Sequence, residues 1–248
     1  MTNRDHFIIK EDEVLEQLGL LDQFILQKKE GYRFTIDPIL LAGFTEVKNE
    51  DQILDAGTGG GILPFLLYKN NRDKNIRITG VDIQPEYIDM AERSRKGNYL
   101  NNMTFMTADI RSIGKEYAGR YDLVITNPPF FKKKEGKISK NTEIALAKHE
   151  LMIDFQTIIK KASQCLHQKG RFVFIHRSER FVEISMHLKA EGFCISRMQF
   201  IYPNANSGSK LFMAEAVKSS ARQMTVMPPL IIYQEDGSYS PKVRELYG

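Results

Sequence analysis

The tetrapeptide Asn127-Pro128-Pro129-Phe130 follows an apolar stretch and combines an amide, two prolines and an aromatic ring. An amino group conjugated to a ring is a poor nucleophile because its lone pair is delocalised. The Asn127 side-chain oxygen and the Pro128 carbonyl can accept hydrogen bonds from both N–H groups of such an amine, which raises the electron density on nitrogen. Proline stiffens this segment and removes competing donors, and Phe130 offers a stacking face worth roughly 1–3 kcal/mol per base. The tetrapeptide therefore predicts a catalytic site that activates a planar exocyclic nitrogen.

A glycine-rich segment with the sequence DAGTGGG occupies residues 55–61. Glycine lets the backbone turn sharply and approach a ligand closely. A Walker loop would require GK[ST] after four intervening residues, and a dinucleotide-binding GxGxxG would require glycine where Ile62 stands. The remaining match is the DxGxGxG loop of S-adenosylmethionine-dependent enzymes. It predicts that the cofactor binds at Asp55, Gly57, Thr58, Gly59 and Gly61, with Asp55 orienting the loop or reaching the methionine amine.

Two acidic residues follow the glycine segment, each at the end of a predicted strand. Asp82 lies about 20 residues beyond the glycines, where a carboxylate can accept hydrogen bonds from both ribose hydroxyls. Asp109 is predicted to accept from the adenine 6-amino group, and Ile83 to flank the adenine. Ligands of open α/β sheets bind at the carboxyl ends of the strands, so Ile110 and Asn127 complete the predicted cofactor-binding set.

Short apolar runs alternate with helical segments from residue 52 onwards, which predicts a parallel sheet covered on both faces. Only the loop 202–209 separates the last two predicted strands, so we expect these two to pair antiparallel. The sequence therefore predicts a Rossmann-like class I methyltransferase fold, with a seven-stranded, mostly parallel sheet and one antiparallel strand near the C-terminus. The predicted strands are 52–56, 77–83, 103–109, 121–127, 171–177, 193–202 and 210–218, and the predicted helices are 61–70, 85–98, 151–168 and 178–191.

The first 50 residues are predicted to form an extension packed on the core, and residues 51–248 the methyltransferase domain. The extension is expected to contain a short helix over residues 11–18 and a hairpin of strands 23–27 and 32–36. A capping helix is predicted to start at 37–38, with Asp37 as its N-cap and Pro38 in the first helical position.

Residues from about Tyr32 to Lys218 resemble the NPPY-type amino methyltransferases, and among them the bacterial tRNA-valine adenine-N6 methyltransferase family. The matching stretches are FTIDPILLAGF, DAGTGGGILPFLL, GVDIQPEYIDMAERS, TNPPFF and ALAKHE. The resemblance implies methyl transfer from S-adenosylmethionine to an adenine N6 in the anticodon-loop region of a valine tRNA. Gly60 stands where the family commonly has Asn, and Phe130 where it commonly has Tyr. The second exchange keeps the stacking face but loses the phenol hydrogen bond, which leaves the substrate base open.

A run of lysines directly follows the tetrapeptide. The net charge of +4 is too small to indicate nucleic acid by itself. An extruded base, however, leaves its backbone beside the mouth of the pocket, where cations can contact phosphates. We therefore predict that RNA binds at Lys132, Lys133, Lys134, Lys137 and Lys140.

Other functions are less well matched by the sequence. A ribosomal RNA guanine-N2 or a protein glutamine-N5 methyltransferase would share the NPP chemistry, but both commonly carry more sequence outside the catalytic domain. A non-catalytic RNA-binding protein of this fold would be expected to lose the acidic residues or Asn127, and all are intact. No apolar run approaches the roughly 20 residues that span a bilayer, and Cys165 and Cys194 show no metal-ligand spacing. We expect a cytoplasmic enzyme with no membrane contact and no metal, and His176 as a candidate substrate contact.

Overall fold

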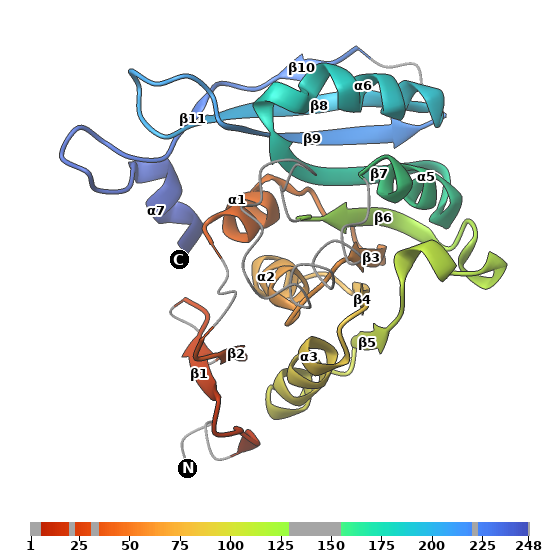
Figure 1. The fold of residues 1–248 in the computed structure, drawn as a ribbon, viewed down its shortest axis with the longest axis vertical. Helices are drawn as coiled ribbons and strands as arrows, with labels where there is room; N and C mark the ends of the chain where they lie inside the picture. The colour runs from red at the N-terminus through yellow and green to blue at the C-terminus, as the bar shows by residue number, and fades with distance from the viewer. Residues whose placement is uncertain (1–5, 20–22, 31–34, 129–154, 220–222, 248) are drawn as a thin grey trace, which may run out of the picture.

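The computed structural model describes residues 6–19, 23–30, 35–128, 155–219 and 223–247. Within these residues a nine-stranded sheet has the order β10-β8-β9-β7-β6-β3-β4-β5, with β11 beside β8 (Figure 1). Its strands are β3 (Gln52–Ala56), β4 (Arg77–Asp82), β5 (Met103–Thr107), β6 (Tyr121–Thr126), β7 (Leu166–Arg177), β8 (Phe193–Tyr202), β9 (Leu211–Lys218), β10 (Thr225–Val226) and β11 (Leu230–Ile231).

The strand directions confirm the predicted fold class. β3 pairs parallel with β4 and β6, β4 with β5, and β6 with β7, whereas β9 is antiparallel to both β7 and β8. The prediction of seven strands was wrong, because β10 and β11 add to the edge strand β8. Each of these has two residues, which is too short for a side-chain period to indicate a strand.

Helices cover both faces of the sheet. They are α1 (Asp37–Phe44), α2 (Ile62–Asn70), α3 (Pro85–Gly97), α5 (Phe155–Cys165), α6 (Phe181–Ala190) and α7 (Pro241–Tyr247). The helix predicted over 151–168 is wrong at its end, because Leu166 already pairs with Tyr121 in the sheet. Residues 151–154 lie outside the described part of the chain. Of the helices in that part, none is long and apolar enough to cross a membrane.

The central strands bury side chains in two separate cores. In β6, Leu123 and Ile125 belong to the core that includes residues of α1, α2 and α3, while Val124 belongs to the core that includes residues of α5 and α6. Alternate residues of a strand point to opposite faces, so both faces of β6 are covered. This double burial explains why the strand sequences are continuously apolar rather than alternating.

The N-terminal region differs from its prediction. Instead of a helix over 11–18, the chain forms β1 (Glu13–Gln17), which pairs antiparallel with β2 (Phe24–Lys28). Tertiary contacts override the helical propensity of this segment. The predicted strand 23–27 is confirmed as β2, but its partner is β1, and most of the second predicted strand, 32–36, lies outside the described residues. The capping helix is confirmed as α1, with Asp37 as its first residue rather than its N-cap.

Candidate active site

The sheet order brings the predicted site residues to one edge. β6, β3, β4 and β5 are neighbours and all run parallel, so their carboxyl ends lie side by side. In register, Asp55 is opposite Ile125 on one side and Gly80 on the other. The glycine segment, Asp82, Asp109 and Asn127 therefore follow adjacent strand ends, where ligands of such sheets bind.

The glycine segment turns back from β3 and leads into α2 through left-handed backbone. Gly57 and Gly59 have φ angles of 80° and 52°, a region that side chains with a Cβ rarely adopt. The N–H groups of Gly57 and Thr58 both donate to the Val81 carbonyl at 2.9 Å, which fixes the turn to β4. A Cβ placed on Gly57 or Gly59 would meet no heavy atom within 4 Å. The outer side of this loop is thus open for a ligand to lie against the backbone.

Thr58 contributes to this loop through its backbone rather than its side chain. The residue is 3% exposed, and a Cβ on Gly80 would come within 2.7 Å of its hydroxyl oxygen. Gly80 therefore leaves the room in which the Thr58 side chain packs. Sequence reasoning missed Gly80, although a glycine inside an apolar strand is a known sign of close approach.

Asp82 links the glycine loop to the end of β4. Its Oδ2 accepts from the Gly59 N–H and its Oδ1 from the Gln84 N–H, both at 2.9 Å. Each carboxylate oxygen has a second lone pair, so both can also accept from the two hydroxyls of a ribose. Ile83 follows and is half-buried.

Asp55 lies behind the loop, with none of its surface exposed. Among the described residues, neither of its carboxylate oxygens makes a hydrogen bond of normal geometry, although the nearby Thr58 hydroxyl partly lowers the pKa of Asp55. Burial raises the pKa of Asp55 to about 7, and the charge of Asp82 acts in the same direction. A buried anion without a partner is costly, so a cation bound nearby would stabilise its charged form.

Asp109 is engaged by a residue that the sequence analysis missed. The Arg111 N–H donates to its Oδ1 at 2.8 Å and the Arg111 Nε to its Oδ2 at 2.7 Å. These bonds to Arg111 hold the pKa of Asp109 below its ordinary value. Asp109 thereby caps the short 3-10 helix η2 (Ile110–Ser112), in which Ile110 is buried. In the sequence, only the position of Arg111 two residues after Asp109, within the turn that Asp109 caps, could have indicated this contact.

Asn127 emerges from β6 beside the glycine loop. The Thr126 hydroxyl donates to the Ala56 carbonyl at 2.7 Å, which ties the last residue of β6 to the last residue of β3. Asn127 is half-buried and Pro128 is buried. The other predicted catalytic and RNA-binding residues lie outside the described residues: Pro129, Phe130, Lys132, Lys133, Lys134, Lys137 and Lys140.

His176 lies inside the fold rather than on the surface of the edge. It is 2% exposed, and its ring centroid is 4.7 Å from that of Phe155. Burial lowers the pKa of His176 to about 4, so the ring is neutral near pH 7. The Arg177 N–H donates to its Nδ1 at 2.8 Å, and Arg180 Nη1 lies 3.3 Å from its Nε2.

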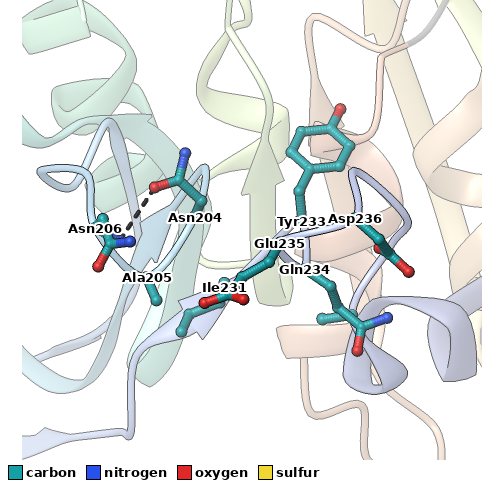
Figure 2. A pocket seen from close by; sticks show the side chains of 9 residues that line it. Asn204, Ala205, Asn206, Ile231, Tyr233, Gln234, Glu235 and Asp236 are labelled. Atoms are coloured by element: carbon teal, nitrogen blue, oxygen red, sulfur yellow. Dashed lines mark hydrogen bonds between the residues drawn. The ribbon is translucent and has the colours of Figure 1, made fainter.

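A separate hollow of about 810 Å³ lies at the end of β8. Figure 2 shows Asn204 and Asn206 on one side, Asp236 on the other, and Ile231 and Glu235 between them. The residues lining it include two carboxylates and no cationic side chain, so it is poorly suited to phosphate. Of the predicted site residues that the structure describes, none lines this hollow. In the part of the chain that the structure describes, there is also no group of three or more metal-ligating side chains.

Solved structures with a similar fold include methyltransferases. A predicted O-methyltransferase from Agrobacterium tumefaciens has a TM-score of 0.68 at 20% identity and covers 85% of this chain and 95% of its own. An S-adenosylmethionine-dependent methyltransferase from Aquifex aeolicus has a TM-score of 0.53 at 16% identity, covering 73% and 89%. At these identities the likeness shows the fold alone.

Curated relatives align over most of the sequence. One from Dyadobacter fermentans is 26% identical over 230 residues, covering 90% of this chain and 92% of its own. One from Actinobacillus pleuropneumoniae is 25% identical over 231 residues, with the same coverage of both chains. Each is named tRNA1(Val) (adenine(37)-N6)-methyltransferase. The sequence model of a family described as "Methyltransferase domain" matches residues 47–219, which is more than half of the chain. The protein therefore belongs to this methyltransferase domain family.

Proposed function

We propose that this protein is an S-adenosylmethionine-dependent methyltransferase that methylates the N6 amine of an adenine in the anticodon-loop region of a valine tRNA. One observation carries the proposal. The Thr126–Ala56 and Gly59–Asp82 hydrogen bonds hold the start of the NPPF segment, the glycine loop and the strand-end acid at one sheet edge. The shared name of the curated relatives supports adenine in tRNA as the substrate. A tRNA substrate also implies that the enzyme acts in the cytoplasm.

The residues at this edge fit the proposed cofactor. The open side of Gly57 and Gly59 accommodates a ligand against the backbone, and Asp82 has acceptor capacity for a ribose. Asp55 is a buried carboxylate without a hydrogen-bond partner in the part of the chain that the structure describes, and the cofactor carries an ammonium and a sulfonium. Its nearby positive charge would offset the cost of ionising Asp55.

Asn127 and Pro128 are proposed to act on the substrate nitrogen. When bound, S-adenosylmethionine supplies a methyl group already activated by the sulfonium. The Asn127 side-chain oxygen and the Pro128 carbonyl accept from the two N–H groups of the adenine amine, which localises its lone pair toward the methyl carbon. Holding the reacting atoms in line supplies much of the acceleration, so no strong general base is needed. The nitrogen becomes acidic after methylation and then loses its proton.

The RNA is proposed to be held by the lysines at 132, 133, 134, 137 and 140. Cations that neutralise phosphates release counterions, so binding weakens as salt rises. Replacing Lys132, Lys133 and Lys134 with Gln should flatten this salt dependence and raise the KM for tRNA while leaving cofactor affinity unchanged. An unaltered salt slope in that triple variant would mean that these lysines do not contact RNA.

The whole proposal is tested by incubating the protein with isotopically labelled S-adenosylmethionine and unmodified total tRNA. Nucleoside mass spectrometry should detect label in N6-methyladenosine from the valine tRNA fraction. The Asn127→Ala variant serves as the matched control, because it keeps the cofactor loop and should yield no product above background. Label in N2-methylguanosine, or only in protein, would refute the proposed substrate.

A further inference from the structure

The β1–β2 hairpin, residues 13–28, is fastened to α3 by a buried ion pair. Arg93 donates from Nη2 to Glu13 Oε1 at 2.5 Å and from Nη1 to Glu13 Oε2 at 2.7 Å. The Glu13 side chain is 1% exposed and that of Arg93 is 11% exposed. Burial alone would raise the pKa of Glu13, but the two bonds from Arg93 hold it below its ordinary value. This bidentate pair is therefore ionised and fixed in orientation at neutral pH.

The second strand of the hairpin is fastened to the same helix through its backbone. The Leu26 N–H donates to Ser94 Oγ at 2.9 Å, and Ser94 is fully buried. The Phe24 N–H donates to Asn98 Oδ1 at 3.0 Å, and Asn98 Nδ2 donates back to the Phe24 carbonyl at 2.6 Å. The position of β2 is thus set by α3 rather than by the sheet.

These attachments bring β2 to the glycine loop. The Leu26 carbonyl oxygen lies 3.8 Å from the place where a Cβ of Gly60 would stand. Gln23 also donates to the Phe65 carbonyl in α2 at 3.4 Å. Figure 1 shows β2 beside α2 and α3, the two helices that start at the glycine loop and just after Asp82. The hairpin therefore approaches the segment proposed to bind the cofactor at Gly60, whereas the Cβ directions of Gly57 and Gly59 stay open for the ligand.

We infer that this hairpin is a positioning element of the cofactor site, and that Glu13 and Arg93 are its positioning residues. By holding β2 against the Gly60 segment and against α3, the ion pair keeps the glycine loop and the exit from β4 in the geometry that receives the ligand. Neither side chain contacts the cofactor. The inference rests on the proposed function only for the identity of that ligand.

The test uses Glu13→Gln in the full-length protein, with S-adenosylmethionine titrated by calorimetry. We expect the Kd for the cofactor to rise about tenfold, because a less ordered loop should weaken binding by about as much as the loss of one hydrogen bond. Single-turnover methyl transfer at saturating cofactor and tRNA should stay within about twofold of the parent, because the reacting groups are untouched.

Asp51→Asn is the matched control, since Asp51 forms another buried ion pair, with Arg171, at 2.5 Å. It should lower the melting temperature at least as much as Glu13→Gln while leaving the Kd unchanged. If Glu13→Gln does not fold, Ser94→Ala removes a milder attachment, and a Kd raised about threefold is then expected. A Kd equal to that of the parent in the folded hairpin variant, or an equal rise in the control, would overturn the inference alone. A parent protein that binds no cofactor would refute the proposed function as well.

Discussion

Two buried aspartates stand at opposite ends of the same strand and have opposite surroundings. Asp51, just before β3, is 4% exposed and accepts from Arg171 Nη2 at 2.5 Å and from the Lys48 N–H at 2.7 Å. Asp55, within β3, is completely buried, and its carboxylate has no hydrogen-bond partner among the residues with a described structure. The same residue type is satisfied at the amino edge of the sheet and left unsatisfied at the carboxyl edge.

The difference separates residues that hold the fold from residues that are proposed to bind a ligand. At the amino edge, Arg171 also donates to the Glu46 carbonyl, and Asp122 accepts from His167 at 2.7 Å. Such closed networks have little left to offer a ligand. At the carboxyl edge the carboxylates can still accept hydrogen bonds. Leaving such groups buried and unpaired costs stability without a ligand, but it allows them to interact with a bound one.

The largest effect is expected from the amino edge. Asp51→Asn would leave the Arg171 guanidinium buried without its counter-charge, which should cost about 3–5 kcal/mol of unfolding free energy. Urea denaturation followed by circular dichroism measures this loss. A variant as stable as the parent would show that the Asp51–Arg171 pair does not stabilise the fold. The contrast drawn between Asp51 and Asp55 would then be wrong for Asp51.

Asn127→Ala should have the next largest effect, but on chemistry. Removing a positioned acceptor at the reacting nitrogen should lower kcat by about a hundredfold or more. The melting temperature should stay close to that of the parent, because Asn127 is half-buried and follows the end of β6. Cofactor affinity should change little, because the side chain that is removed is proposed to face the substrate amine and not the groups that anchor the cofactor. Single-turnover transfer with saturating cofactor and tRNA gives the decisive rate. Transfer at the parental rate would exclude activation of the amine by this residue.

Asp82→Ala should weaken cofactor binding by about 1–3 kcal/mol, since charge-assisted hydrogen bonds to the ribose are lost. The Gly59 and Gln84 N–H groups lose their acceptor as well. Calorimetric titration compares the variant with Asp82→Asn, which retains one acceptor oxygen and should bind with intermediate affinity. Equal affinity in all three proteins would remove Asp82 from the cofactor site.

The smallest effect is a pH dependence of stability at Asp55. Its pKa in the fold is raised from 3.8 to about 7, so the folded state favours the protonated form. The resulting stability is present below the unfolded pKa and is lost as the pH rises through about 7. Asp55→Asn stays neutral, so without cofactor it should melt at least a few degrees above the parent at pH 8 and close to it at pH 3.5, below the unfolded pKa of 3.8. An equal difference at both pH values would contradict the raised pKa.

The sequence predicted the carboxyl edge well because its residues follow strand ends in chain order. Asp82 and Asn127 could be placed by counting strands, since parallel neighbours share an edge. Gly80 and Thr126 were missed, although each packs or hydrogen-bonds within that edge. Their roles depend on which atoms face each other across neighbouring strands, and a strand pattern does not contain that information.

The hairpin was predicted less well, for a related physical reason. Glu13 lies in a segment with helical propensity, and its partner Arg93 is 80 residues away. The cost of burying that carboxylate is offset only in the folded state, so local sequence gives no sign of it. The short edge strands β10 and β11 were not predicted for the same reason, because they are strands only through their pairing with β8.

The antiparallel β8–β9 pair has a consequence for the order in which the chain folds. These strands are joined by the loop 203–210 and close a local contact, whereas the Thr126–Ala56 bond joins residues 70 positions apart. Loop closure costs more entropy as the loop lengthens, so distant pairings form late. The edge of the sheet farthest from the glycine loop can therefore be in place while the catalytic edge is still open. Pulsed hydrogen exchange during refolding should accordingly protect the amides of β9 before those of β3, and a chain arrested between these stages would have a folded edge but no cofactor site.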